Sequence, residues 1–194
     1  MSRSRDEFFR ALSGRTGADP TGQAGKGLAG QLLAAFGPSR RDPSKPNTAA
    51  AAKALGVTQR TVQRWLADSS RQHQRPRQET MKKIATRSRQ AATTKRGRQR
   101  STAPIAAKYT KTGMRLTLTG VQGPEPGPDY ERFRTVAFEF DPDLAAAFMN
   151  AYETGGDAAA RAFISRHAPE LYNMPTWNIG DVDNVQLSGP YGIN

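Results

Sequence analysis

The chain has 194 residues, of which 29 are Lys or Arg and 17 are Asp or Glu, so its formal net charge is +12. The lack of Cys and the wide separation of the two His residues exclude a Cys/His zinc site and a disulfide scaffold. No stretch contains the roughly 18 apolar residues of a membrane span and the opening lacks a signal-peptide pattern, so we expect a cytoplasmic protein without a membrane partner.

The first residues predict little regular structure. Residues 1–12 favour a short helix, and the Gly-rich residues 13–27 are typical of a linker, so we expect residues 1–27 to be a flexible segment. From residue 28 the apolar side chains recur on one helical face, and Gly37 followed by Pro38 ends the predicted helix at residue 36.

Residues 48–66 are the most informative part of the chain. The Ala-rich residues 48–55 favour a helix, Gly56 permits a tight turn, and Thr58 is a suitable cap for a second helix over 59–66. This spacing is typical of a DNA-binding helix-turn-helix, in which the second helix enters the major groove. The alternative is a helical hairpin with a solvated polar face. Five polar residues would face outward, where Gln can bond adenine and Arg guanine: Thr58, Gln59, Arg60, Gln63 and Arg64.

A long basic stretch follows. Residues 71–115 contain 14 Lys or Arg and a single acid, Glu79. An apolar stripe predicts a helix from Arg77 to about Thr94 that completes a DNA-binding domain over 28–94. Residues 95–100 contain no apolar side chain and predict a disordered or phosphate-tracking arm within a basic linker, 95–112. As a cluster, rather than singly, these residues are expected to contact phosphate: Arg77, Lys82, Lys83, Arg87, Arg89, Lys95 and Arg96.

The remaining residues, 113–194, predict a small α+β domain. Strict alternation over residues 114–119 predicts a half-buried strand, and a Gly/Pro-rich loop precedes a second strand over 132–140. Asp141 and Pro142 start a helix to about residue 153, a further helix reaches about 167, and 181–188 predict a third strand. We therefore expect an α+β fold in which an all-helical domain precedes a small sheet with two helices on one face.

Charge divides along the chain. Residues 1–115 have a net charge of +19 and residues 116–194 a net charge of −7. Because phosphate neutralisation releases condensed counterions, the basic half favours nucleic acid as its partner and predicts a nucleoid-associated protein. The acidic half is expected to bind proteins instead.

The order of these parts resembles a known family. GVTQRTVQRWL (56–66), the basic stretch after it, RTVAFEF (134–140) and a helical pair ending in PELYN (169–173) resemble the telomere-protecting terminal proteins of actinobacterial linear chromosomes and plasmids. The resemblance is densest over residues 56–96 and returns loosely over 132–173. It implies a protein primer, in which a Thr hydroxyl becomes bonded to the 5′ end of telomeric DNA.

The resemblance also implies the partners and the reacting group. A DNA polymerase would supply the divalent metal and the dNTP, so the chain would need no cofactor of its own and would not be an enzyme, and a telomere-binding protein would be a further partner. The family's priming Thr precedes the strand that matches RTVAFEF. The nearest candidates are Thr119 and Thr117, and we favour Thr119 because we expect it at a strand end beside a loop.

Two other classes remain open from the residues alone. The first is a helix-turn-helix transcriptional repressor or plasmid replication-control protein, with the acidic half forming a homodimer. The second is an enzyme acting on DNA through a metal, for which the candidate acids are Glu139, Asp141 and Asp143, and Asp181 with Asp183. We expect no such metal site, because Asp141 and Asp143 have sufficient roles at the start of a helix.

Overall fold

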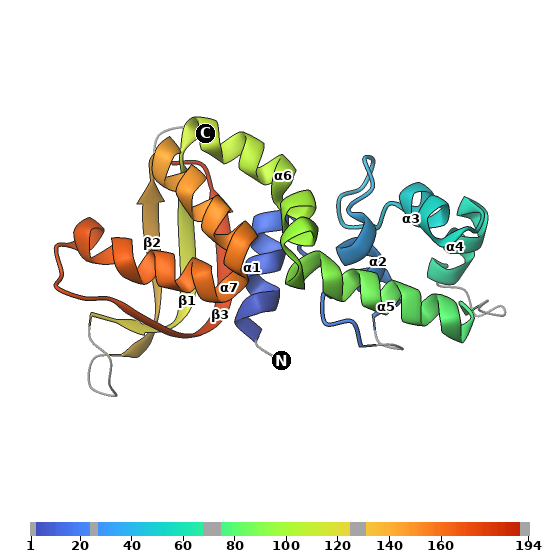
Figure 1. Cartoon of the computed structure of the whole chain (residues 1–194), viewed down its shortest axis with the longest axis horizontal. Helices are drawn as coiled ribbons and strands as arrows, with labels where there is room; N and C mark the ends of the chain where they lie inside the picture. The colour runs from blue at the N-terminus through green and yellow to red at the C-terminus, as the bar shows by residue number, and fades with distance from the viewer. Residues whose placement is uncertain (1–2, 24–26, 68–74, 125–130, 191–194) are drawn as a thin grey trace. The chain divides into compact units, whose positions relative to one another are not determined.

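The computed structural model describes residues 3–23, 27–67, 75–124 and 131–190. The chain divides into two compact units, one of residues 15–94 and the other of residues 1–14 together with 95–194 (Figure 1). Helices combine with a three-stranded antiparallel sheet, so the fold class is α+β as predicted. No helix in the described part of the chain is long and apolar enough to cross a membrane.

The 15–94 unit is helical. Its elements are α2 (Leu28–Phe36), α3 (Thr48–Leu55), α4 (Gln59–Leu66) and α5 (Gln78–Thr93). The first three match the predicted ranges because the apolar periodicity and the end signals agree there. α5 is one residue shorter than predicted at each end. One buried cluster joins all four helices: Leu32, Ala51, Ala52, Val62 and Ile84.

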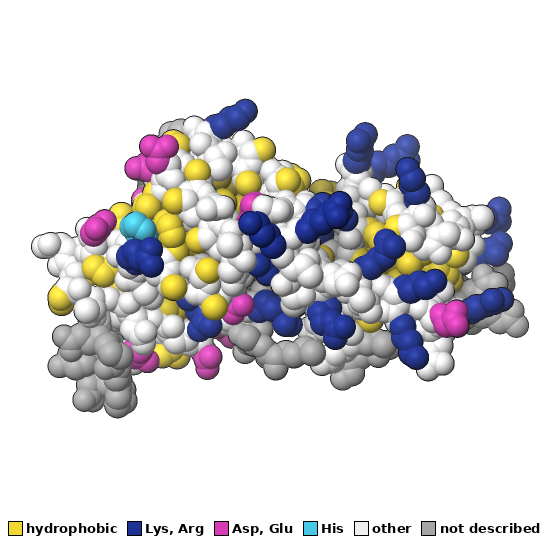
Figure 2. Space-filling model, viewed as in Figure 1, with side chains coloured by type: hydrophobic (Ala, Val, Ile, Leu, Met, Phe, Trp, Pro, Cys, Tyr) yellow, Lys and Arg dark blue, Asp and Glu magenta, His cyan; other side chains and the backbone are white. Residues whose placement is uncertain are grey.

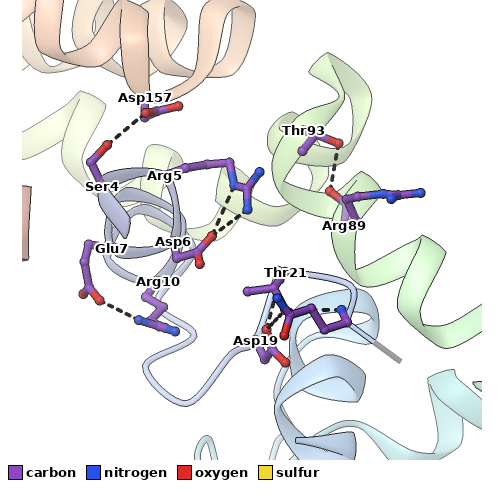
Figure 3. Close-up of polar contacts among 11 residues, drawn as sticks. Ser4, Arg5, Asp6, Glu7, Arg10, Asp19, Thr21, Arg89, Thr93 and Asp157 are labelled. Atoms are coloured by element: carbon purple, nitrogen blue, oxygen red, sulfur yellow. Dashed lines mark hydrogen bonds and ion pairs between the residues drawn. The ribbon is translucent and has the colours of Figure 1, made fainter. Parts of the chain in front are cut away.

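The segment before α2 differs from the flexible linker that its composition predicts. Ala18 is 1% exposed, and Asp19 Oδ1 accepts hydrogen bonds from the main-chain N and the hydroxyl of Thr21 (Figure 3). The buried Arg15 donates from Nη1 to Ala34 O at 2.6 Å, at the end of α2. Burial lowers the pKa of Arg15 to about 10, which leaves it charged at neutral pH. Residues 24–26 of the expected linker lie outside the described residues.

The other unit contains the sheet. Its strands are β1 (Met114–Gly123), β2 (Arg132–Phe140) and β3 (Asn178–Ser188), and β1 lies between β2 and β3. β2 has the predicted bounds, whereas β1 runs four residues further than predicted and β3 begins three residues earlier. Residues 125–130, which include the end of the predicted Gly/Pro loop, lie outside the described residues.

Two helices cover one face of this sheet. They are α1 (Arg3–Ser13) and α7 (Pro142–Tyr172), and side chains from both join the cluster formed by β1, β2 and β3 (Figure 1). Phe8 and Leu12 of α1 are 0% exposed, so α1 belongs to the core rather than to a flexible N-terminal segment. Ser4 Oγ donates to Asp157 Oδ2 at 3.0 Å and ties α1 to α7 (Figure 3).

The predicted pair of helices over 142–167 is one element with an internal break. Gly156 has φ 72° and ψ −154°, outside the helical region, and separates the two halves of α7. The second half reaches Tyr172 and is longer than expected because Pro169 and Leu171 still lie in the helix.

Residues 95–112 form α6 (Lys95–Thr112), not the expected disordered arm and linker. Arg98 is 6% exposed, and Ser101 and Thr102 are also buried. Thr102 Oγ1 donates to Glu153 Oε1 of α7 at 2.7 Å. The buried face of α6 is therefore polar in this turn, which is why a search for apolar periodicity passes over it.

Candidate nucleic-acid interface

The helix pair α3 and α4 has defined ends. Asn47 Oδ1 accepts a hydrogen bond from Ala50 N at 3.0 Å at the start of α3. Gly56 ends α3 with φ 70°, a left-handed conformation that favours glycine. Thr58 Oγ1 accepts from Thr61 N at 3.2 Å and caps α4 as predicted. Side-chain caps therefore fix the starts of both helices, and Gly56 makes the turn between them.

α4 presents most of its side chains to solvent. Val62 is its only fully buried residue, and Trp65 and Leu66 are half-buried against the cluster below. The five residues predicted to read bases are all exposed: Thr58, Gln59, Arg60, Gln63 and Arg64.

These five residues have different neighbours. Besides capping α4, Thr58 shares a hydroxyl contact of 2.8 Å with Thr61. Gln59 Nε2 donates to Thr48 Oγ1 at 3.0 Å and so links the first turns of α4 and α3. The described residues offer no hydrogen bond or ion pair to the side chains of Arg60, Gln63 and Arg64. Thr58 and Gln59 therefore have structural roles at the start of α4, and whether any of the five residues reads bases stays a prediction.

α5 adds a row of exposed cations. Its apolar and small residues face the cluster, and Lys82, Lys83, Arg87 and Arg89 are exposed, as is Arg77 before the helix. The Arg87 guanidinium lies 5.8 Å from the centre of the Phe36 ring, a cation–π geometry that positions this side chain. Lys and Arg side chains gather over the helices of this unit in Figure 2.

The structure does not place the whole predicted basic cluster in one unit. Lys95 and Arg96 are exposed on α6, which belongs to the unit that contains the sheet. Residues 15–94 contain 15 Lys or Arg and 4 Asp or Glu, a net charge of +11, and the rest of the chain has a net charge of +1. The predicted contrast between a basic and an acidic half is therefore one between a basic unit and a nearly neutral one.

Sequence reasoning missed several exposed cations of the same unit. Arg40, Arg41 and Lys45 are exposed in the loop between α2 and α3, and Lys53 is exposed on α3. For the three loop cations the signal is present in the sequence as the string SRRDPSKPN (39–47), which contains two Arg, one Lys and one acid.

The candidate priming threonines lie on the sheet face opposite the one that α1 and α7 cover, and no described helix lies on it. Thr117 and Thr119 are half-buried on β1, opposite Ala137 and Thr135 of β2. Thr119 lies in the middle of β1, so the expectation that it ends the strand beside a loop is wrong. The hydroxyls of Thr119 and Thr135 are 2.8 Å apart. Sequence reasoning missed Thr135, because only the strand register brings it beside Thr119.

The acidic residues form no metal-binding group in the described ranges. Asp141 Oδ1 accepts from Leu144 N at 2.8 Å, which is the helix cap that the sequence predicts. Glu139 pairs with Arg115 across the strands at 3.5 Å. These contacts give two of the acids structural roles.

No protein-family model, curated protein or solved structure matches this chain. The resemblance of residues 56–96 and 132–173 to terminal proteins stays a prediction from the sequence.

Proposed function

We propose that residues 15–94 bind duplex DNA as a helix-turn-helix unit, with α4 in the major groove. The observation that supports this most is the exposure of Arg60, Gln63 and Arg64 on a capped helix that fully buries only Val62. The major groove admits one α-helix, and Arg and Gln side chains can bond guanine and adenine edges bidentately. Base selectivity would come from these three residues.

The cations of α5 would supply affinity without selectivity. Lys82 and Arg89 are seven residues apart and Lys83 and Arg87 four apart, so each pair shares a helical face. Four exposed cations on one helix of a unit with a net charge of +11 can neutralise backbone phosphates of a duplex. Binding would weaken steeply with salt, by a log–log slope of about 0.9 for each phosphate contact.

For the unit that contains the sheet we propose a priming role, which makes the chain a terminal protein of linear replicons. The Thr119 oxygen, or that of Thr117, would attack the α-phosphate of a dNTP held by a DNA polymerase. A Thr–O–P bond forms, the bond to pyrophosphate breaks, and the hydroxyl proton passes to the polymerase site or solvent. The support is the position of both hydroxyls on the uncovered sheet face, where a second protein can approach.

Other parts of the proposal follow from the same step. The polymerase supplies the divalent metal and the dNTP, and the chain itself is the substrate rather than an enzyme. A telomere-binding protein would help bring the polymerase to the DNA end. Nucleoid association in the cytoplasm would follow from DNA binding by the 15–94 unit.

One observation favours the repressor or replication-control alternative. Phe133 is 66% exposed and lies opposite Val121 on the same sheet face as Thr119. A second copy of the chain could cover this apolar pair and form a homodimer, as a repressor with two DNA half-sites requires.

Mass spectrometry separates the two functions. DNA from the host is purified without protease, digested with nuclease, and the attached protein is cut with trypsin. Cleavage after Arg115, Arg132 and Arg134 places Thr117 and Thr119 in peptide 116–132 and Thr135 in peptide 135–161. Priming predicts peptide 116–132 with the added mass of a deoxynucleotide. If the peptides are unmodified and the protein binds an internal DNA site, the result supports the repressor and contradicts priming.

A further inference from the structure

The loop between α2 and α3 is held at its base. Pro38 and Pro46 form an isolated antiparallel bridge, and Asn47 N donates to Gly37 O at 2.9 Å. Ser39 N donates to Lys45 O at 2.8 Å one step further along the loop. Two prolines at the base also restrict the backbone. The loop is therefore a short hairpin whose two ends are held together, not an unconstrained connection.

The tip of this hairpin exposes two arginines. Asp42, the only acid of the loop, is engaged within it: Oδ1 accepts from the main-chain N and the hydroxyl of Ser44, and Oδ2 lies 3.1 Å from Lys45 Nζ. The Ser44 hydrogen bond and Lys45 hold the pKa of Asp42 below its usual value. Arg40 and Arg41 are exposed, and no group of the described residues forms a hydrogen bond or ion pair with either guanidinium.

A chain of contacts links the hairpin to α4, the helix that is proposed to read bases. Asn47 closes the hairpin on Gly37 and at the same time caps α3. The next residue, Thr48, accepts a hydrogen bond from Gln59 at the start of α4. The base of the hairpin and the first turns of α3 and α4 therefore meet at one place, so the hairpin begins beside the first turn of α4, which contains Arg60.

We propose that the 37–47 hairpin is a second DNA contact, in which Arg40 and Arg41 bind backbone phosphates beside the groove that α4 enters. The proposal rests on duplex binding by the 15–94 unit. Guanidinium groups bind phosphate oxygens bidentately, and the paired base of the hairpin already constrains the backbone that carries these two, so little backbone entropy is lost on binding. This contact adds affinity and fixes the orientation of α4, but it reads no base.

The test compares two double variants with equal loss of charge. R40Q/R41Q removes the hairpin cations, and K111Q/R166Q removes two exposed cations from the other unit. Fluorescence anisotropy measures Kd against salt for a duplex selected from a random library and for a scrambled duplex. Thermal unfolding checks that both variants keep the wild-type transition.

R40Q/R41Q is expected to lower the magnitude of the log–log salt slope by about 1.8 on both duplexes and to weaken binding by about tenfold or more near 0.1 M salt. The affinity ratio between the two duplexes stays as in the wild type, and K111Q/R166Q changes the slope little. Hydroxyl-radical footprinting should show loss of protection on one side of the α4 site only.

Two results overturn the proposal in different ways. If the wild type binds the selected duplex and R40Q/R41Q keeps the slope and footprint of K111Q/R166Q, the hairpin makes no contact and the proposed DNA-binding function stands. If the wild type shows no salt-dependent binding to any duplex, both the hairpin contact and the proposed function fall.

Discussion

Arg98 donates a hydrogen bond from Nε to the main-chain oxygen of Glu153 at 3.0 Å. Its Nη2 donates to Thr154 O at 2.7 Å. In an unbroken helix these two carbonyls would accept from residues 157 and 158, but the backbone leaves the helical region at Gly156. A guanidinium of α6 therefore serves the broken end of the first half of α7, where the helix dipole favours positive charge.

Arg98→Met is expected to destabilise the unit that contains the sheet by about 2–4 kcal/mol. The change removes two charge-assisted, part-buried hydrogen bonds and leaves the carbonyls of Glu153 and Thr154 without these donors. Urea unfolding followed by circular dichroism measures the loss. Arg100→Met is the control, because Arg100 is exposed on the same helix and its loss should cost about 0.5 kcal/mol or less. Equal losses for the two variants would show that Arg98 is not a structural anchor.

Gly56→Ala tests the turn between α3 and α4. The backbone there has φ 70°, and a Cβ would meet no atom within 4 Å, so the cost is conformational strain alone. We expect a loss of about 1–2 kcal/mol for Ala and a smaller loss for Gly56→Asn, since Asn tolerates the left-handed region. Thermal unfolding of both variants gives the comparison. If Asn destabilises as much as Ala, strain at Gly56 is not the cause.

The proposed base reading and the proposed phosphate binding by the 15–94 unit are separable by two single variants. Arg64→Ala should weaken binding to a selected duplex by about 1–3 kcal/mol and relax the base preference, with little change on a scrambled duplex. Lys82→Ala should weaken both duplexes alike and lower the salt slope by about one unit. The measurement is anisotropy at several salt concentrations. A loss for Arg64→Ala that is equal on both duplexes would remove Arg64 from the reading group.

The helices of the 15–94 unit were predictable because local signals agree with the tertiary structure there. Leu32, Val62 and Ile84 each lie on the apolar face of their own helix and meet in one cluster. Gly56 and Thr58 mark a turn and a helix start. The hairpin over 37–47 was not predictable, because its base is a contact between two prolines that no short-range sequence pattern encodes.

In the unit that contains the sheet, the strands were predictable from the sequence. Which helices belong to this unit was harder to predict. Phe8 and Leu12 become core residues only when β3, late in the chain, lies against α1, so residues 1–14 resemble a loose terminus when taken alone. α6 was missed because Arg98 and Thr102 fill buried positions where a sequence pattern needs apolar side chains. The position of Thr119 depends on how far β1 extends, and element boundaries are the least predictable feature of a sequence.

The priming proposal makes its strictest prediction at Thr119, whose hydroxyl touches that of Thr135. Thr119→Val keeps the shape and the β-propensity of the side chain but removes the nucleophile, so the strand should stay folded. With the host polymerase and a radioactive dNTP, Thr119→Val should lose all covalent labelling, Thr119→Ser should restore it, and Thr117→Val should label as the wild type does.

Thr135→Val separates the nucleophile from its neighbour. It deletes the hydrogen-bond partner of Thr119 but leaves the Thr119 oxygen in place, so labelling should fall without vanishing and should still map to peptide 116–132. Full labelling of Thr119→Val with label in peptide 135–161 would instead assign the linkage to that peptide, with Thr135 the first candidate. Full labelling in peptide 116–132 would leave Thr117 and Tyr130 as the other hydroxyls of that peptide, and adding Thr117→Val would distinguish them. Because the three variants differ only in which hydroxyl is removed from the same sheet face, the label position decides among them.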